Sequence, residues 1–267
     1  MVRVRTDGNA MTPQPSPDVA VVAGGTTGIG LATVRVLRAA GRQVALFSSS
    51  PAKVQAAADA LAREDGPAFH AAAADVQDGG AVADLLQEIR GRLGPPTTLV
   101  YCAGLSPKRN GLRIPLHETP TEEWQRTFDV NLTGAFHAIR CVLPDMIEAR
   151  LGRIVLVGSM GARALPRLAG SPYVAAKAAM AGLMRSVIGE YGAHGVTCNI
   201  VAPGNVLTDM VRHLPMDRLA ELTARVPCGR LGQAEDVAPV IELLCRRDSG
   251  FISGAIIDVN GGEFIAL

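Results

Sequence analysis

Short apolar runs alternate with longer amphipathic segments along almost the whole chain, and this alternation limits the possible folds more than any other feature. In the first unit, residues 19–23 are apolar throughout, a glycine-rich stretch follows, and an amphipathic segment continues to Gly41. The apolar run is typical of a strand buried on both faces, and the amphipathic segment is typical of a helix. Strands buried on both faces occur in parallel sheets that helices cover on both sides.

The same unit recurs to the end of the chain. Further strands are expected at 43–49, 68–74, 97–104, 153–159, 196–204 and 255–262, and helices over 51–64, 79–92, 121–150 and 171–192. This order predicts an α/β fold of the Rossmann type: a doubly wound parallel seven-stranded sheet flanked by helices on both faces. The 267 residues, 48% of them hydrophobic, suit one such domain over 18–267. Residues 1–17 hold no apolar run, and we expect a disordered tail there.

Charge and cysteine content argue against several classes of partner. The 26 Lys and Arg residues nearly balance 25 Asp and Glu residues, and no basic run reaches five residues. Nucleic acid is therefore not an expected partner. The N-terminal residues show neither a signal-peptide nor a membrane-anchor pattern, so we expect a cytoplasmic protein without a membrane partner. The five cysteines include no Cys-x-x-Cys spacing, so neither a disulfide framework nor a metal site is expected.

Glycine and polar residues gather at the ends of the expected strands, where doubly wound sheets bind their ligands. These positions are Gly24 to Gly30, Ser48, Asp75, Ala103, Gly104, Ser159, Pro203 and Gly204. Gly24, Gly28 and Gly30 lie between a strand and a helix, where they allow a tight turn and a close approach to a pyrophosphate. The amides at the start of the helix can hold that pyrophosphate. The sequence therefore predicts a dinucleotide site at this edge of the sheet.

Tyr173 and Lys177 lie four residues apart in an expected helix and so share one of its faces. Ser171 is expected to cap this helix and Pro172 to lie in its first turn. A lysine cation beside a tyrosine favours the phenolate and lowers the pKa of the phenol, and a helix N-terminus acts in the same direction. The pair is a candidate for proton transfer. Taken alone, it also fits an aromatic side chain packed at a helix start beside a solvated lysine.

These motifs, in this order and at these spacings, resemble the short-chain dehydrogenase/reductase family over residues 18–262. The residues from Gly24 to Gly30 resemble the cofactor loop of the family, and Asp75-Val76 resembles the pair beside the adenine. The residues that match its catalytic set are Asn131, Ser159, Tyr173 and Lys177. Together with the strand ends, the resemblance gives an expected cofactor-binding set of Gly24, Thr26, Thr27, Gly28, Ile29, Gly30, Ser48, Ser49, Asp75, Val76, Ala103, Gly104, Tyr173, Lys177, Pro203, Gly204, Val206 and Thr208.

The resemblance implies hydride transfer between a nicotinamide and a ketone or secondary alcohol. Tyr173 would exchange a proton with the substrate oxygen, and Ser159 would hydrogen-bond the same oxygen. Lys177 would lower the pKa of the tyrosine and hold the ribose hydroxyls, and Asn131 would support a water chain that reprotonates the lysine. One departure is plain: Tyr101-Cys102 stands where the family usually has Asn-Asn. The hydrogen bonds that the first asparagine normally makes are therefore an open question.

The end of the second strand carries serines and no carboxylate that could bind the ribose 2′-hydroxyl of NAD. Hydroxyls of Ser48 and Ser49, with Lys53 or Arg42 nearby, would suit the phosphate of NADP. We therefore favour NADP(H) over NAD(H) as cofactor. The serines equally fit a polar turn and a helix cap.

Residues 205–231 resemble the substrate lid of the family and mix apolar residues with Arg212 and His213. The loop 106–113 is also basic, as are Arg163 and Arg167; these charges could contact an acyl carrier or a coenzyme A phosphate, or be solvated. In outline the chain is similar to 3-oxoacyl-carrier-protein reductases, so we expect an NADPH-dependent reductase of a small-molecule ketone or 3-oxoacyl thioester. An NAD-dependent secondary-alcohol dehydrogenase and a non-catalytic cofactor-binding sensor are the alternatives. The resemblance also implies a homotetramer.

Overall fold

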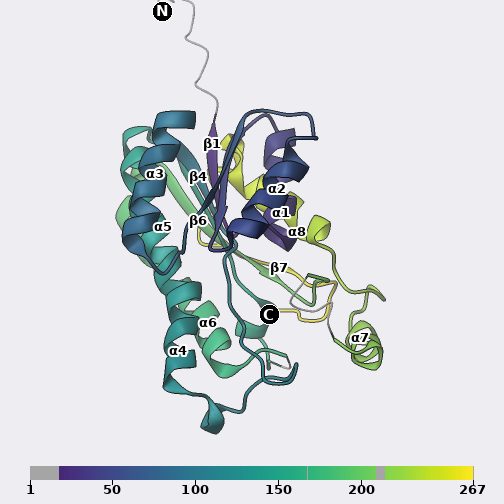
Figure 1. Ribbon diagram of the computed structural model, residues 1–267. Coiled ribbons are helices and arrows are strands. Elements are labelled where there is room, and N and C mark those ends of the chain that lie inside the picture. Colours follow the sequence, from purple (N-terminus) through teal and green to yellow (C-terminus); the bar gives the residue numbers. More distant parts are fainter. Residues whose placement is uncertain (1–17, 167, 209–213, 267) are drawn as a thin grey trace, which may run out of the picture.

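The computed structural model describes residues 18–166, 168–208 and 214–266 (Figure 1). The tail expected over 1–17 lies outside the described residues. The strands form one parallel sheet in the order β3-β2-β1-β4-β5-β6-β7. They are β1 (Val19–Ala23), β2 (Gln43–Ser48), β3 (Phe69–Ala73), β4 (Pro96–Tyr101), β5 (Gly152–Val157), β6 (Val196–Pro203) and β7 (Ile256–Val259). The prediction of a doubly wound Rossmann sheet is confirmed, with the change of direction between β1 and β4.

Helices cover both faces of the sheet. They are α1 (Gly28–Ala39), α2 (Pro51–Leu61), α3 (Gly79–Leu93), α4 (Thr121–Phe128), α5 (Gly134–Glu148), α6 (Ser171–Tyr191), α7 (Met216–Thr223) and α8 (Ala234–Cys245). Most predicted helices end within one turn of the observed bounds. The helical stretch predicted over 121–150 is helical from Thr121 to Glu148, but a π-helical turn at Asp129–Thr133, which was not predicted, lies between α4 and α5.

Helix α8 has no counterpart among the predicted elements. Its start carries a capping box, in which the side chains of Gln233 and Asp236 each accept a hydrogen bond from the backbone of the other. Val237, Ile241 and Leu244 follow at helical spacing and are buried against the sheet. The cap and this periodicity are the signals from which α8 could have been predicted.

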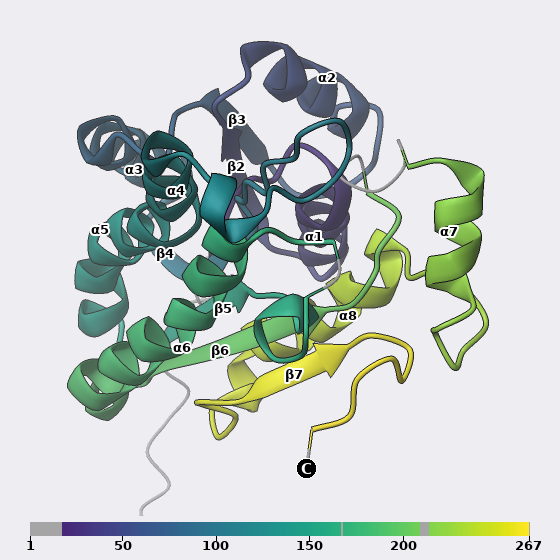
Figure 2. The same ribbon diagram turned by 90° about the horizontal axis from the view of Figure 1, so that it is seen from below.

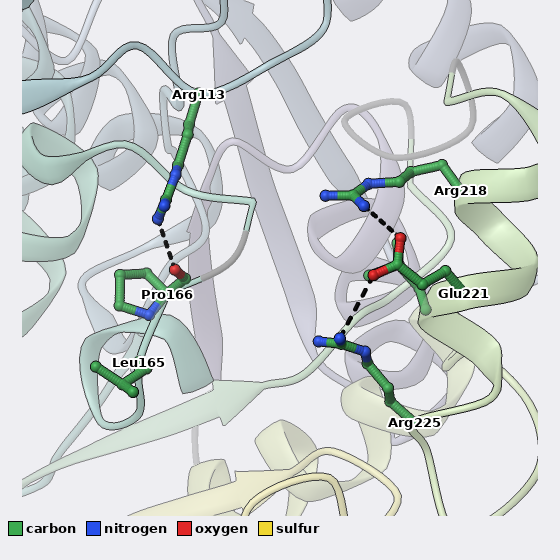
Figure 3. A pocket seen from close by; sticks show the side chains of 7 residues that line it. Arg113, Leu165, Pro166, Arg218, Glu221 and Arg225 are labelled. Carbon is green, nitrogen blue, oxygen red and sulfur yellow. Dashed lines mark hydrogen bonds and ion pairs between the residues drawn. The ribbon is translucent and has the colours of Figure 1, made fainter.

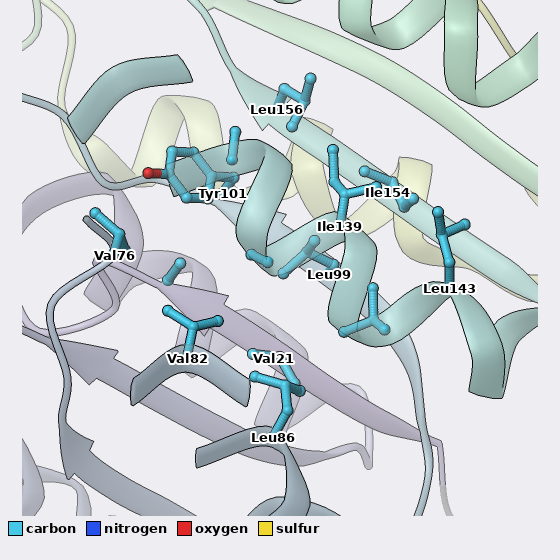
Figure 4. Packing of buried hydrophobic residues seen from close by; sticks show 14 of the residues in the cluster. Val21, Val76, Val82, Leu86, Leu99, Tyr101, Ile139, Leu143, Ile154 and Leu156 are labelled. Carbon is cyan, nitrogen blue, oxygen red and sulfur yellow. The ribbon is translucent and has the colours of Figure 1, made fainter. Parts of the chain in front are cut away.

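The core is divided between the two faces of the sheet, because successive side chains of each strand point in opposite directions. Along β1, Val19, Val21 and Ala23 pack toward α3, α5 and α6, whereas Ala20 and Val22 pack toward α1, α2 and α8. Figure 4 shows the first of these layers. Burying one large aliphatic side chain contributes roughly 1.5–3 kcal/mol, so these two layers hold the strand ends in fixed relative positions.

All seven strands end at the same edge of the sheet, which Figure 2 shows from below. Helix α7 lies at this edge, to one side of the sheet. Among the helices that the structure describes, none combines the length and the apolar character needed to cross a bilayer.

Candidate active site

The glycine-rich loop after β1 is folded so tightly that side chains would not fit. Gly24 and Gly28 have positive φ angles of 75° and 50°, a region that favours glycine. A Cβ at Gly30 would lie 2.1 Å from the carbonyl oxygen of Gly24. The amide of Gly24 donates to the carbonyl of Phe47 at 2.8 Å, which fixes the loop beside β2. The tight turn expected from the sequence is therefore present, and the binding of a pyrophosphate at the start of α1 stays a prediction.

The other loop residues support this turn. Thr26 is 5% exposed, and Thr27 is the N-cap of α1 without a capping bond from its side chain. Ile29 packs against the buried residues beneath α1. Ile29 therefore anchors the loop to the core.

Ser48, at the end of β2, has a buried hydroxyl with no hydrogen-bond partner among the described residues. A buried hydroxyl without a hydrogen-bond partner lowers the stability of the fold, and a ligand that bonds to it removes this cost. Ser49 beside it is exposed, and Ser50 caps α2 by accepting from the amide of Lys53 at 3.4 Å. The glycine cradle and the unpaired Ser48 hydroxyl together fit the pyrophosphate and the adenosine sugar of a dinucleotide.

Arg42 does not lie near this serine turn, contrary to expectation. It lies at the start of β2, and its guanidinium donates to Thr98 Oγ1 at 3.0 Å and to the carbonyl of Cys245 at 2.6 Å. The parallel register places that end of the strand at the opposite edge of the sheet from Ser48. Arg42 is therefore a structural residue.

Asp75 and Val76 follow β3, and both are fixed by hydrogen bonds. Asp75 Oδ1 accepts from the amide of Gln77 at 3.0 Å. The carbonyl of Val76 lies 3.0 Å from Nδ1 of His137 on α5. His137 was not among the predicted site residues, and no motif in the sequence marks it.

Asn131 lies in the π-helical turn and is fully buried. Its Nδ2 donates to the carbonyls of Thr127 and Leu105, both at 2.8 Å, and its Oδ1 accepts from the amide of Leu105 at 3.3 Å. The side chain therefore joins the turn to the loop after β4. π-Helical turns of this kind frequently occur at functional sites.

Tyr101 stands where the family usually has an asparagine, and it makes a hydrogen bond of its own. Its side chain is fully buried, and its hydroxyl donates to the carbonyl of Val130 at 2.5 Å. A Cβ at Gly134 would lie 2.4 Å from that hydroxyl, so the glycine makes room for it. The tyrosine thus supplies a hydrogen bond to the turn that holds Asn131. The neighbouring Cys102 is a neutral thiol, because burial raises its pKa to about 12.

Lys177 is 4% exposed, and its Nζ donates to the carbonyl of Val157 at 2.7 Å. Burial lowers the pKa of this ammonium to about 8. A Cβ at Gly104 would lie 3.2 Å from Asn131 Oδ1 and 3.6 Å from Lys177 Nζ. The structure therefore brings Asn131, Gly104 and Lys177 together, with Ala103 next to Gly24.

Ser159 and Tyr173 lie beside Lys177. Ser159 Oγ accepts from the amide of Gly161 at 3.1 Å. The pKa of Tyr173 is raised, because burial outweighs a hydrogen bond with Ser159 that acts in the opposite direction. The expected lowering by Lys177 is therefore not observed: its Nζ lies 5.8 Å from the centroid of the tyrosine ring.

The start of α6 also differs from expectation in one detail. Gly170 is the N-cap, Ser171 is the first helical residue, and no side chain caps the helix. Tyr173 is still in the first turn, as predicted.

The segment after β6 returns to the glycine loop. The amide of Gly204 donates to the carbonyl of Val259 at 2.9 Å, which holds the end of β6, Pro203, beside β7. Val206 is buried, and its carbonyl accepts from the amide of Thr208 at 2.8 Å. A Cβ at Gly28 would lie 3.1 Å from Thr208 Cγ2, so Thr208 faces the cradle.

A cavity of about 450 Å³ lies between the lid region and two loops (Figure 3). It is lined by Arg113, Leu165 and Pro166 from the loops and by Arg218, Glu221, Leu222 and Arg225 from α7 and the residues after it. Arg163 does not contribute, because it pairs with Asp258 and stacks on Phe264. The expected roles of Arg167, Arg212 and His213 lie outside the described residues. Within the described ranges, no group of three or more His, Cys, Asp or Glu side chains could hold a metal ion.

A glycine cradle at the head of α1, with Ser159 after β5 and with Tyr173 and Lys177 on α6, is typical of a nicotinamide-dependent oxidoreductase of the α/β type. Comparisons with known proteins identify the family of this chain. A family model described as enoyl-(acyl carrier protein) reductase matches residues 23–263. The chain belongs to the short-chain dehydrogenase/reductase family, and it is an oxidoreductase.

Its relatives differ in substrate. A 3-oxoacyl-[acyl-carrier-protein] reductase of Pseudomonas aeruginosa is 34% identical over 93% of this chain and 98% of that protein. A cis-4-hydroxycyclohexanecarboxylate dehydrogenase of Sinomonas cyclohexanicum is 38% identical over 91% of this chain and 95% of that protein. The crystal structure of a 3-oxoacyl-[acyl-carrier protein] reductase from Brucella melitensis superposes with a TM-score of 0.89 at 31% identity, covering 99% of this chain and 100% of the other. A Brucella melitensis reductase with bound NAD has a TM-score of 0.87 at 30% identity, covering 98% and 99% of the two chains.

Proposed function

We propose that this enzyme reduces a ketone of the 3-oxoacyl thioester kind with NADPH, and that Tyr173 is the proton donor. The observation that carries the proposal is the juxtaposition of Ser159, Tyr173 and Lys177 at the strand ends beside the glycine cradle. The relatives named as 3-oxoacyl-carrier-protein reductases support this substrate class.

When bound, the nicotinamide supplies the hydride. Tyr173 donates its phenolic proton to the carbonyl oxygen as that oxygen becomes an alkoxide, and Ser159 hydrogen-bonds the same oxygen. The raised pKa keeps Tyr173 protonated at neutral pH and so ready to donate. Lys177 Nζ, which lies 5.8 Å from the centroid of the Tyr173 ring, would hold the ribose hydroxyls of the cofactor.

Asn131 has a narrower role than its polarity suggests. Both hydrogens of its amide are used by the carbonyls of Thr127 and Leu105. Only Oδ1 is left with a lone pair, because it accepts a single bond, from the amide of Leu105. We assign Oδ1 as the acceptor for the water chain that returns a proton to Lys177.

The test is the loss of reduced-nicotinamide absorbance when the enzyme is mixed with NADPH and a short 3-oxoacyl thioester. Turnover by the parent and none by Tyr173→Phe, at equal cofactor affinity, is the expected result. A Tyr173→Phe enzyme as active as the parent would overturn the assignment of the proton donor.

The preference for NADP(H) rests on the unpaired Ser48 hydroxyl and on the absence of a carboxylate at the end of β2. The Brucella melitensis relative with bound NAD argues for the other cofactor. Ser48→Asp should weaken NADPH binding by tenfold or more, because two negative charges would meet at about 4 Å. Equal dissociation constants of the parent for NADPH and NADH would refute the preference.

A second candidate is the reverse reaction, NAD-dependent oxidation of a secondary alcohol. The relative named as a hydroxycyclohexanecarboxylate dehydrogenase favours it. In that direction Tyr173 takes the proton. Initial rates in both directions at one pH, with each cofactor, separate the two. A non-catalytic sensor is disfavoured, because a pure cofactor binder needs neither Ser159 nor Tyr173.

We also propose a homotetramer located in the cytoplasm. Phe136 on α5 is 45% exposed and Trp124 on α4 is 36% exposed, and such aromatic side chains are frequent in interfaces between subunits. Other apolar residues of the two long helices are buried within the subunit: Ile139, Leu143, Met180, Met184 and Val187. Light scattering that gives a monomer would contradict the tetramer, and cell fractionation tests the location.

A further inference from the structure

We infer that the cavity between α7 and the loops after β4 and β5 binds an anionic group of the substrate, a carboxylate or a phosphate. This inference rests on the proposed function, because it describes what the substrate of that site carries. Three segments far apart in the sequence form the cavity, and each contributes side chains to its lining (Figure 3). Arg113 belongs to the first loop, Leu165 to the second, and Arg218 to α7.

The charges around the cavity do not balance. Three arginines and one glutamate line it, so its lining carries a net charge of +2. Arg218 and Arg225 share the single carboxylate of Glu221: Arg218 contacts one oxygen, and Arg225 Nη2 lies 3.4 Å from the other. Glu221 thus compensates only one of these two guanidinium groups.

Arg113 faces this pair from the opposite wall. Its Nη1 donates to the carbonyl of Pro166 at 2.8 Å, which is a neutral acceptor. Among the described residues it makes no ion pair with a carboxylate. The hydrogen bond to Pro166 holds the guanidinium over the cavity and leaves its positive charge uncompensated. A planar guanidinium can donate two parallel hydrogen bonds to the oxygens of a carboxylate or a phosphate.

The floor of the cavity is apolar and connects to the catalytic loop. Leu222 lies in a cluster of buried side chains with Val226 and Leu231, and Leu168 packs against it. Leu165 and Leu168 both belong to the segment that joins Ser159 to α6. A substrate with an apolar body and a terminal anion would therefore lay its body on the leucines, with the anion between the arginines.

Two sources of the anion share this chemistry: the carboxylate of a small oxo acid, and the phosphate of a phosphopantetheine arm. The assay compares each with a neutral counterpart that lacks the anionic group, using the full chain and saturating reduced cofactor. The first pair is 4-oxopentanoate and 4-oxopentanamide. The second is acetoacetyl-pantetheine 4′-phosphate and acetoacetyl-pantetheine.

The parent should prefer the anionic member of one pair by roughly tenfold in kcat/KM, the effect of one partly exposed charge-assisted hydrogen bond. That ratio should fall toward one in Arg113→Gln and in Arg225→Gln, and with added salt. Arg92→Gln is the control, because Arg92 is an exposed arginine on α3 that does not line the cavity and is paired with Glu88. The pair that responds identifies the source. Equal rates within both pairs, or ratios that the two cavity variants leave unchanged, would overturn the inference.

Binding without turnover separates this inference from the proposed function. Dissociation constants measured by ligand-observed NMR for 4-methylpentanoate, 4-methylpentanamide, pantetheine 4′-phosphate and pantetheine need no reduction. An anion that binds about tenfold more weakly to Arg113→Gln than to the parent supports the anion site even if no ketone is reduced, an outcome that would refute only the proposed function. If 4-methylpentanoate binds no more tightly than 4-methylpentanamide, and pantetheine 4′-phosphate no more tightly than pantetheine, the anion site is refuted whatever the reductase assay gives.

Discussion

Replacing Tyr101 by phenylalanine tests how this chain replaces the asparagine that its family usually has after β4. The substitution removes one oxygen and keeps the ring, which packs in the layer between the sheet and α5 (Figure 4). The lost bond is the one from the hydroxyl to the carbonyl of Val130 in the π-helical turn. The perturbation is therefore confined to one hydrogen bond beside the turn that carries Asn131.

The magnitude follows from burial. Tyr101 is 0% exposed, so water cannot take the place of the missing hydroxyl. Leaving a buried carbonyl without its donor costs about 1–3 kcal/mol, and the retained ring avoids the larger cost of a cavity. We expect a loss of about 2 kcal/mol in the free energy of unfolding, within that range.

Urea unfolding at a fixed protein concentration measures this loss, with an unchanged slope showing that the folded state stays compact. Tyr191→Phe is the control, because the hydroxyl of Tyr191 lies at the surface beside Glu190. Its stability should stay within about 0.5 kcal/mol of the parent. A Tyr101→Phe protein as stable as this control would refute the argument that the tyrosine hydroxyl holds the turn.

Three further predictions concern the site. Tyr173→Phe should abolish turnover while leaving cofactor affinity unchanged in a fluorescence titration; a large loss of affinity would mean that the phenol serves mainly to bind the cofactor. Gly30→Ala should prevent dinucleotide binding, because its Cβ would lie 2.1 Å from the carbonyl oxygen of Gly24; unchanged binding in the same titration would contradict the tight-cradle geometry. Burial lowers the pKa of Lys177 from 10.5 in the unfolded chain to about 8, so its charge destabilises the fold below pH 8 and ceases to do so as pH rises through 10.5. Across that window the unfolding free energy of the parent should rise by roughly 3 kcal/mol relative to Lys177→Met, and parallel pH profiles of the two proteins would show that the lysine is solvated.

The sheet was predictable because its signals are local. The side chains of a five-residue apolar run such as 19–23 point to both faces of a sheet, so a strand of this kind is buried when helices cover both faces. The glycines after it fit a tight turn. The same applies to the convergence of Gly24, Ser48 and Gly104 on one edge, which follows from parallel strands alone.

The errors arose where distant contacts decide the outcome. The π-helical turn, which the helical pattern did not predict, lies where Asn131 bonds to Leu105, a residue on another segment. Arg42 was expected near the cofactor because it lies close to Ser48 in sequence, but a strand carries its two ends to opposite edges. The cavity arginines could be recognised as basic, yet nothing local indicated that Arg113 and Arg225 line the same space.

The protonation states of the buried pair favour one direction of reaction. Burial raises the pKa of Tyr173 and lowers that of Lys177, since each shift opposes a charge in a poorly solvated site. At neutral pH the tyrosine therefore holds its proton, as reduction of a ketone requires, and the lysine is still mostly a cation. Oxidation must begin from the phenolate, which this environment makes scarce. In the mechanism we propose, the resting enzyme therefore favours reduction near pH 7, and oxidation should gain as the pH rises toward the pKa of Tyr173.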